Sequence, residues 1–316
     1  MELTVSVSDD GDISFKDEAG NPVSEEIIGI AKKQQGQKIR DLIASKCDEI
    51  NSAVESLGLL HIGVPNPKKP LSYVERAFEV PFPSKPIPKR PNLLQRFLPG
   101  KRKALEERNE LEALKYDENC REWEIQKRQF EKNENLKADL VRLAHAGRTT
   151  AMETFLSELL QDIEWPRETA VSFEVEDDGK LVAFDVDLPE VEEMPTKTAS
   201  VPQRGYRLSV KEMSDTKIRR LYANHIHSLA LRIIGETFGM LPTVESVTFS
   251  GYSQRRSKET AQLADEYLLS VRARRSDWEE IDFSSLESLD PVQALDRFEL
   301  RRSLTKTGIF KSIDPF

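Results

Sequence analysis

Residues 171–188, Val-Ser-Phe-Glu-Val-Glu-Asp-Asp-Gly-Lys-Leu-Val-Ala-Phe-Asp-Val-Asp-Leu, decide how the C-terminal half of the chain folds. Apolar and polar side chains alternate on both sides of Asp177-Asp178-Gly179, which has the residue types of a tight turn. A period of two places the apolar side chains on one face of a β-hairpin and the acidic ones on the other. We therefore expect a half-buried hairpin whose apolar face covers a core.

The segments around this hairpin predict a mixed α+β domain over residues 148–316. Ser214-Asp215 has the residues of a helix start, and the helix should run through Phe238 to the stop signals Gly239 and Pro242. A last helix is expected to start at Asp290-Pro291. The sequence also predicts a helix before the hairpin and three further strands, at residues 206–213, 244–249 and 267–273.

Residues 101–147 have the composition of a long charged helical arm, rich in Glu, Lys, Arg and Leu and free of proline. A thin, imperfect apolar stripe follows this segment, made of Leu111, Leu114, Trp123, Phe130, Leu136, Leu140 and Leu143. Such a stripe is typical of a coiled-coil arm, or of a helix laid along another surface. We expect a protein partner or self-association through this arm.

Residues 61–100 form a proline-rich basic linker before the arm. Nine of the 17 prolines lie between Pro65 and Pro99, which favours extended polyproline II geometry. Between Glu79 and Glu106 the sequence has basic residues and no acidic ones. A solvated tether is the interpretation that we favour, and a docking strip for an acidic surface or a phosphate backbone is the alternative.

Residues 1–60 predict a small N-terminal module. Polar and apolar residues alternate from Glu2 to Val7 and again around Phe15, with Asp9-Asp10-Gly11 as a turn between them. Ser24 then begins an amphipathic helix that ends near Gly58. A module of this size is marginal in isolation, so we expect it to pack against another part of the chain or a partner.

Composition limits the class of protein. No apolar run approaches the roughly 18 residues of a membrane span, and the N-terminus has no pattern of a secretory signal. Cys47 and Cys120 lie in helical patterns far apart in sequence, which favours reduced thiols and a cytoplasmic setting. The net charge of −9 opposes indiscriminate nucleic-acid binding, and the acidity lies before residue 203. No glycine-rich nucleotide loop and no paired Cys-x-x-Cys is present.

The order of elements from Thr149 onward, helix, three strands, helix and strand, resembles the core of restriction-endonuclease-like nucleases. That resemblance implies a divalent metal held by acidic residues, with a lysine on the third strand. Asp185 and Asp187 share one strand face with Glu190 just beyond, and Lys211 lies on the next candidate strand. These oxygen ligands would suit Mg²⁺, with Lys211 steadying a nucleophilic water. Ser209 occupies the position where the family has a second acidic residue, so a merely solvated acidic face is the interpretation that we favour.

Two further sets of residues are candidates for chemistry. His225 and His227 are two apart, so on a helix they face nearly opposite directions and cannot hold one metal ion. We expect one of them in the core and the other in solvent. Basic and polar residues of the last two strands and their loop could bind the phosphates of a nucleic acid, and these are Gln254, Arg255, Arg256, Arg272 and Arg274.

Several stretches together resemble an uncharacterised family of bacterial proteins, some of which carry an extra glycine-rich N-terminal domain that this chain lacks. The matching stretches are Asp185-Val-Asp-Leu-Pro-Glu190, Ser250-Gly-Tyr-Ser-Gln-Arg255, Asp265-Glu-Tyr-Leu268, Asp290-Pro-Val292 and Thr305-Lys-Thr-Gly-Ile-Phe310. The resemblance spans nearly the whole chain, and it implies a bacterial cytosolic setting without an activity, a cofactor or catalytic residues.

Two functions remain open from the sequence. The first is a cytosolic interaction or assembly protein whose arm and linker contact a partner. The second is an Mg²⁺-dependent nuclease or a nucleic-acid-binding effector, for example in phage defence. Mg²⁺ is the only cofactor that the sequence points to, and it belongs to the second function alone.

Overall fold

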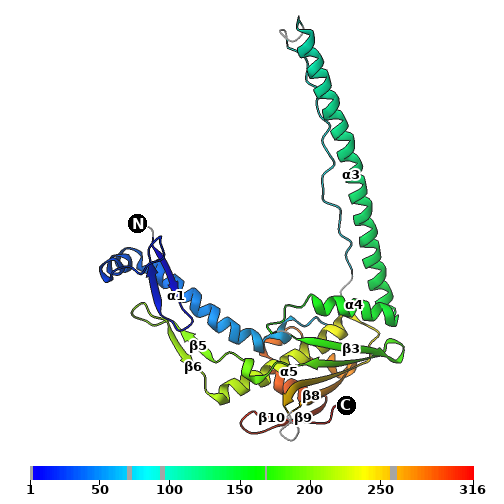
Figure 1. Cartoon of the computed structure of the whole chain (residues 1–316). Helices are drawn as coiled ribbons and strands as arrows, with labels where there is room; N and C mark the ends of the chain where they lie inside the picture. The colour runs from blue at the N-terminus through cyan, green and yellow to red at the C-terminus, as the bar shows by residue number, and fades with distance from the viewer. Residues whose placement is uncertain (1–2, 70–72, 93–96, 168, 257–261) are drawn as a thin grey trace. The chain divides into compact units, whose positions relative to one another are not determined.

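The chain is described by a computed structural model that covers residues 3–69, 73–92, 97–167, 169–256 and 262–316 (Figure 1). It divides into two compact units. We call residues 1–71 and 144–316 the body, and residues 72–143 the arm unit. The domains predicted from the sequence divide the chain differently, with the N-terminal module and the C-terminal domain as separate parts. They form one unit because the end of the N-terminal helix is part of the C-terminal core.

The body has the expected α+β fold, built around a six-stranded mixed sheet in the order β10-β9-β8-β7-β4-β3. The predicted hairpin is confirmed as β3 and β4, paired antiparallel with Ser172 opposite Asp185. Only β4 and β7 run parallel within this sheet. The strands are β3 (Ala170–Glu176), β4 (Leu181–Asp187), β7 (Ser246–Arg256), β8 (Leu263–Arg274), β9 (Glu299–Leu304) and β10 (Phe310–Lys311).

The central helix α5 (Asp215–Met240) packs against β7 of the sheet, against the N-terminal helix and against the turn at Leu60–Gly63. Ser214 caps it as predicted, with its side chain accepting a hydrogen bond from the Lys217 amide. Nearly every residue from Tyr222 to Gly239 is buried. The other helical segments of this part of the body are α4 (Thr149–Gln161), α6 (Arg275–Trp278), α7 (Pro291–Ala294) and short 3₁₀ turns at Leu60–Gly63, Asp177–Gly179, Val191–Glu193, Leu286–Ser288 and Leu295–Arg297.

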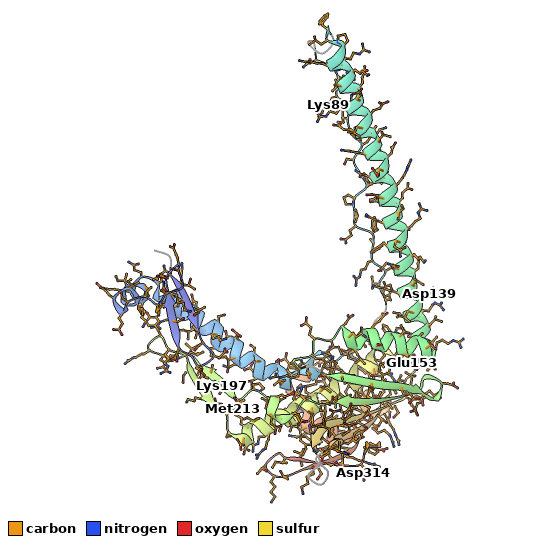
Figure 2. All side chains as sticks on the ribbon, in the orientation of Figure 1. Lys89, Asp139, Glu153, Lys197, Met213 and Asp314 are labelled. Atoms are coloured by element: carbon orange, nitrogen blue, oxygen red, sulfur yellow. The ribbon has the colours of Figure 1, made fainter. Side chains whose placement is uncertain are left out.

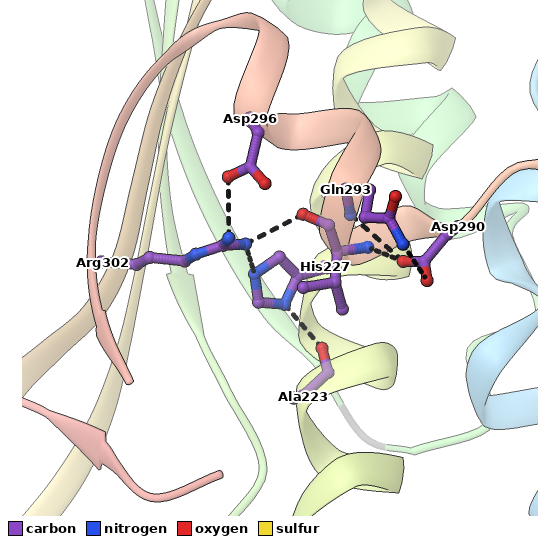
Figure 3. Close-up of polar contacts among 7 residues, drawn as sticks. Ala223, His227, Asp290, Gln293, Asp296 and Arg302 are labelled. Atoms are coloured by element: carbon purple, nitrogen blue, oxygen red, sulfur yellow. Dashed lines mark hydrogen bonds and ion pairs between the residues drawn. The ribbon is translucent and has the colours of Figure 1, made fainter. Parts of the chain in front are cut away.

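The enclosure of α5 buries both histidines, so the expectation that one of them lies in solvent is wrong. The side chains do face different partners, as their spacing requires. His225 Nδ1 lies 3.0 Å from the carbonyl oxygen of Leu57, while His227 Nδ1 lies 2.6 Å from that of Ala223. Arg302 donates to His227 Nε2 at 2.9 Å and also to Asp296 at 2.7 Å (Figure 3). His227 is therefore a neutral core histidine with its proton on Nδ1.

The N-terminal hairpin and helix were predicted correctly. They are β1 (Thr4–Val7), β2 (Ile13–Lys16) and α1 (Glu25–Gly58). Their small core contains Phe15, Ile43 and Leu208, and Leu208 comes from the segment between β4 and α5. That segment forms a separate two-stranded sheet of β5 (Lys197–Ser200) and β6 (Ser209–Glu212).

The strand expected at residues 206–213 therefore exists but does not join the main sheet. Leu208 fills the core of the N-terminal module, and its amide donates to the carbonyl of Gly11 at 3.1 Å. Asn51 of α1 exchanges two hydrogen bonds of 2.9 Å with the backbone of Ala199. A module too small to bury its own apolar surface thus recruits this segment.

Three features of the C-terminal part differ from the prediction. The helix expected from Asp290 is only one α-helical turn, α7, followed by a 3₁₀ turn, although Asp290 caps it through the amides of Val292 and Gln293. The strands β9 and β10 were not predicted. Strands β7 and β8 also extend far into the segment that was interpreted as a polar loop.

The end of α1 and the turn after it dock on α5 through a polar seam. The amide of His61 donates to Ser228 Oγ at 3.0 Å, and Arg232 donates to the carbonyl of Leu60 at 3.3 Å. Next to this seam, Gly235 of α5 lets Val64 lie directly against the helix backbone. A methyl group at Gly235 would overlap Val64 and lie 2.9 Å from Trp278 Cζ2.

Substituting Gly235 with alanine is expected to lower the free energy of unfolding by about 1–2 kcal/mol, because overpacking outweighs the gain in helix propensity. The matched control is Gly29→Ala in α1, where the added methyl would meet nothing within 4 Å beyond its chain neighbours and the backbone of its own helix. That change is expected to raise stability by about 0.5–1 kcal/mol. Urea unfolding followed by circular dichroism measures both, and a gain in stability for Gly235→Ala would contradict the docking.

The arm unit consists of one long helix, α3 (Pro99–His145), and an extended segment that runs beside it (Figure 1). We call residues 73–92 the strap. The amide of Arg76 donates to Glu134, and Lys89 pairs through its backbone with Asn109. Between these two points the helix advances 25 residues, or roughly 37 Å. The strap covers that length in 13 residues, about 2.9 Å each, close to the rise of polyproline II.

The strap is therefore not a solvated tether. Trp123 donates from its indole nitrogen to the carbonyl of Val80 at 2.8 Å, and Phe78 and Phe82 pack edge-on against its ring. Proline-rich sequence supplies the extended geometry at little entropic cost, and the aromatic side chains supply the contact.

Candidate functional site: the open sheet face and the arm

Two of the predicted acidic residues, Asp185 and Asp187, lie on the open face of the sheet, which we define by the side chains that alternate with the buried Val182, Phe184 and Val186. Asp185 is on this face, between Ser172 of β3 and Ser250 of β7 in the strand register. The hydroxyl of Tyr267 donates to Asp185 Oδ2 at 3.0 Å, while the buried Oδ1 has no hydrogen-bond partner within the described structure. The pKa of Tyr267 is raised to about 12. Burial of the hydroxyl is the larger cause, and its hydrogen bond to Asp185 is the second.

The other two acidic residues have different surroundings. Burial, with the carboxylates of Asp265 and Glu193 nearby, raises the pKa of Asp187. Glu190 accepts a hydrogen bond of 2.8 Å from Ser253. Within the described residues, no three His, Cys, Asp or Glu side chains come together in a way that could hold a metal ion. Asp185 and Asp187 are therefore neighbours on the open face without being a formed ligand set, whereas Glu190 bonds to Ser253, whose buried side chain follows Tyr252 and points to the other face of β7.

Lys211 lies away from that face. It is an exposed residue of β6, where it pairs with Thr198 of the two-stranded sheet. The structure thus separates Lys211 from Asp185 and Asp187, because the expected third strand packs with the N-terminal module instead of the main sheet.

Among the predicted basic and polar residues whose side chains the structure describes, Arg272 and Arg274 lie far from Gln254. Arg272 and Arg274 on β8 both contact Glu299 of β9, at 3.5 and 3.4 Å. Arg272 lies opposite Thr248 in the register, and Gln254 is six residues further along β7, roughly 20 Å away. Arg255 and Arg256 follow Gln254 in the same strand. The loop residues Ser257 and Lys258 lie outside the described residues.

The C-terminal residues lie across the open face, a feature that the sequence did not predict. The amide of Phe316 donates to Ser270 Oγ at 3.2 Å, and Arg301 donates to the carbonyl of Pro315 at 2.7 Å. The guanidinium groups of Arg272 and Arg301 lie 4.6 and 4.2 Å from the centre of the Phe316 ring. A shallow groove of about 370 Å³ remains between Phe316, Tyr267 and Asp185.

The arm unit carries the second candidate site. Between Asn109 and Glu134, the positions of α3 that are not classed as exposed recur at steps of three and four residues, which places them on one side of the helix. They are Asn109, Glu112, Tyr116, Cys120, Trp123, Lys127, Phe130 and Glu134. Because the strap contacts belong to this set, we call it the strap seam.

The opposite side of α3 carries an exposed apolar ridge, which we define as Leu111, Leu114, Ile125 and Leu136. Each of the four is more than half exposed, from 52% for Leu111 to 65% for Leu114. At 3.6 residues per turn they lie within about 60° of one another, and their centre is roughly 180° from the strap seam. Figure 2 shows side chains projecting along this unit, from Lys89 of the strap to Asp139 of α3.

The single stripe predicted from the sequence is therefore two separate surfaces. Trp123 and Phe130 belong to the strap seam, whereas Leu111, Leu114 and Leu136 belong to the apolar ridge. Ile125 was missed, although its spacing of eleven residues from Leu114 was visible in the sequence.

The fold and these surfaces define the chain in structural terms, as an α+β body with a strapped helical arm. No family model, no curated protein and no solved structure matches it. Of the helices that the structure describes, none has the length and apolar content to cross a membrane.

Proposed function

We propose that this chain is a cytoplasmic interaction or assembly protein that contacts its partner through the apolar ridge of α3, with the body as its folded anchor. The observation that carries the proposal is the line of four large aliphatic side chains, each more than half exposed, on a highly charged helix. A helix surrounded only by solvent gains no stability from exposed leucine and isoleucine side chains. Burying each of them fully against a partner would contribute about 1.5–3 kcal/mol to the free energy of binding.

The strap supports the same proposal. The strap covers one side of α3 along residues 109–134. The ridge, on the opposite side, therefore belongs to a helix that is stiffened by a second segment. Bracing lowers the conformational entropy that a partner must remove on binding. The alternative, an Mg²⁺-dependent nuclease or a nucleic-acid-binding effector, has Asp185 and Lys211 on different sheets and is not part of the proposal.

Replacing the four ridge residues with glutamine is expected to abolish the native complex while leaving the helix intact, because glutamine has a helix propensity close to that of leucine. The matched control changes Glu106 and Glu131 to glutamine, since these exposed residues lie between the ridge and the strap seam. The measurement is cross-linking in the native host, followed by sizing of the tagged chain.

The control should keep the cross-linked complex, and the ridge variant should lose it. If the ridge variant retained the same cross-linked species as the unmodified chain, the ridge would not be the contact surface and the proposed function would fail.

A further inference from the structure

We infer that the partner of the apolar ridge is a second copy of this chain, packed antiparallel with Ile125 on the twofold axis. This inference rests on the proposed function, and it adds the identity and the orientation of the partner. It follows from the spacing of the ridge, from two charged residues on the same line, and from the ion pairs of α3.

Three of the four ridge residues are spaced symmetrically about Ile125, and Leu111 lies outside this set. Leu114 and Leu136 each lie eleven residues from it, which is three helical turns and roughly 16 Å. When a second α3 is laid antiparallel with the two Ile125 side chains in contact, Leu114 of each copy faces Leu136 of the other. An isologous contact of this kind uses the same surface on both subunits.

Two charged residues on the ridge line are also symmetric about Ile125. Glu118 precedes it by seven residues and Lys132 follows it by seven, and both are exposed. The antiparallel arrangement places Glu118 of each copy opposite Lys132 of the other. A parallel arrangement in register would instead place Glu118 against Glu118 and Lys132 against Lys132, so like charges oppose it.

Neither charge is satisfied within its own helix. Other charged residues of α3 form ion pairs at three- or four-residue spacing, for example Arg108 with Glu112 and Lys127 with Glu131. In the described part of the chain, Glu118 and Lys132 form no ion pair of 4.0 Å or less.

One like-charge approach opposes the arrangement, between Arg121 of one copy and Arg128 of the other. It is reduced because Arg128 lies 3.7 Å from Glu124 of its own helix. Three apolar layers over 23 residues make a short interface compared with a full coiled coil, so we expect a dimer whose population depends on concentration.

The test is sedimentation equilibrium of the purified full chain over a concentration series. The unmodified protein should approach twice the chain mass of 36.1 kDa. Glu118→Lys should weaken the dimer about tenfold, because it sets lysine against lysine at both symmetric contacts. The double variant Glu118→Lys with Lys132→Glu should restore the original affinity, since each contact again joins opposite charges.

A covalent probe tests the axis directly. In a Cys120→Ser background, Ile125→Cys should form a disulfide-linked dimer on mild oxidation, and Glu124→Cys, on a different side of α3, should not. A monomer at all concentrations, or failure of the double charge variant to restore the dimer, would overturn the inference. If the purified chain were monomeric while the native complex still required the ridge, the second copy would be excluded and the proposed function would stand.

Discussion

Replacing Trp123 with alanine is expected to release the strap from α3 and to speed hydrogen exchange at the Arg76 and Lys89 amides by about 30-fold. Trp123 lies between the two points at which those amides are bonded, to Glu134 and Asn109. The substitution removes the indole hydrogen bond to Val80 and the packing of Phe78 and Phe82. A loss of about 2 kcal/mol corresponds to that change in the opening equilibrium.

Two variants control this experiment, which is read by amide exchange with mass spectrometry or NMR. Trp123→Phe keeps an aromatic ring but not the hydrogen bond, so a loss of about 1 kcal/mol and roughly fivefold faster exchange are expected. Ile125→Ala, on the opposite side of α3, should leave both amides unchanged. Equal exchange in the Trp123→Ala and unmodified proteins would mean that the strap is held by other contacts.

Acidification from pH 7 to pH 5 is expected to lower the free energy of unfolding of the body by about 2 kcal/mol through His227 alone. Burial lowers the pKa of His227 to about 4, against an ordinary value of 6.5. Its ring is neutral, with Nδ1 donating to Ala223 and Nε2 accepting from Arg302. Between those pKa values the unfolded state binds more protons than the folded state, so stability is lost as the pH falls from 6.5 toward 4.

The other buried groups set the size of the total effect. Burial lowers the pKa of His61 and of His225, and both add to the loss in acid. Burial raises the pKa of Glu236, which acts in the opposite direction because its folded state takes up a proton more readily.

Urea unfolding at pH 7 and at pH 5, for the unmodified protein and for His227→Gln, measures the contribution of His227. Glutamine does not titrate, so the variant should start less stable at pH 7 and lose about 2 kcal/mol less on acidification. Equal losses in the two proteins would show that His227 does not carry the acid sensitivity. His145→Gln serves as a control for a histidine outside α5.

The local elements could be predicted because the signals that specify them act over a few residues. The hairpin at 171–188 follows from alternation and a turn, the start of α5 from Ser214, and α3 from residues of high helix propensity. The acidic candidates Asp185 and Asp187 were also placed correctly on one strand face. None of these depends on a contact with a distant part of the chain.

The hydrogen-bond and packing partners of those residues could not be predicted from the sequence, because they depend on the register between strands. Tyr267 reaches Asp185 only because β7 and β8 pair across a register shift at Gly251 and Tyr252. The contact of Phe316 with Arg301 likewise depends on β9, whose pairing with β8 local patterns did not reveal.

Tertiary structure alone decided which surfaces exclude water. Periodicity predicts that a segment has an apolar side, but not what covers it. Leu208 packs in the N-terminal core, so its strand lies there and not in the main sheet. Helix α5 is enclosed, and both of its histidines are buried. The strap covers Trp123 and Phe130, two residues of the predicted stripe. The sequence by itself determined the α+β class, the hairpins, the long helices and the charged arm. Packing between distant segments decided which side of that arm is left exposed.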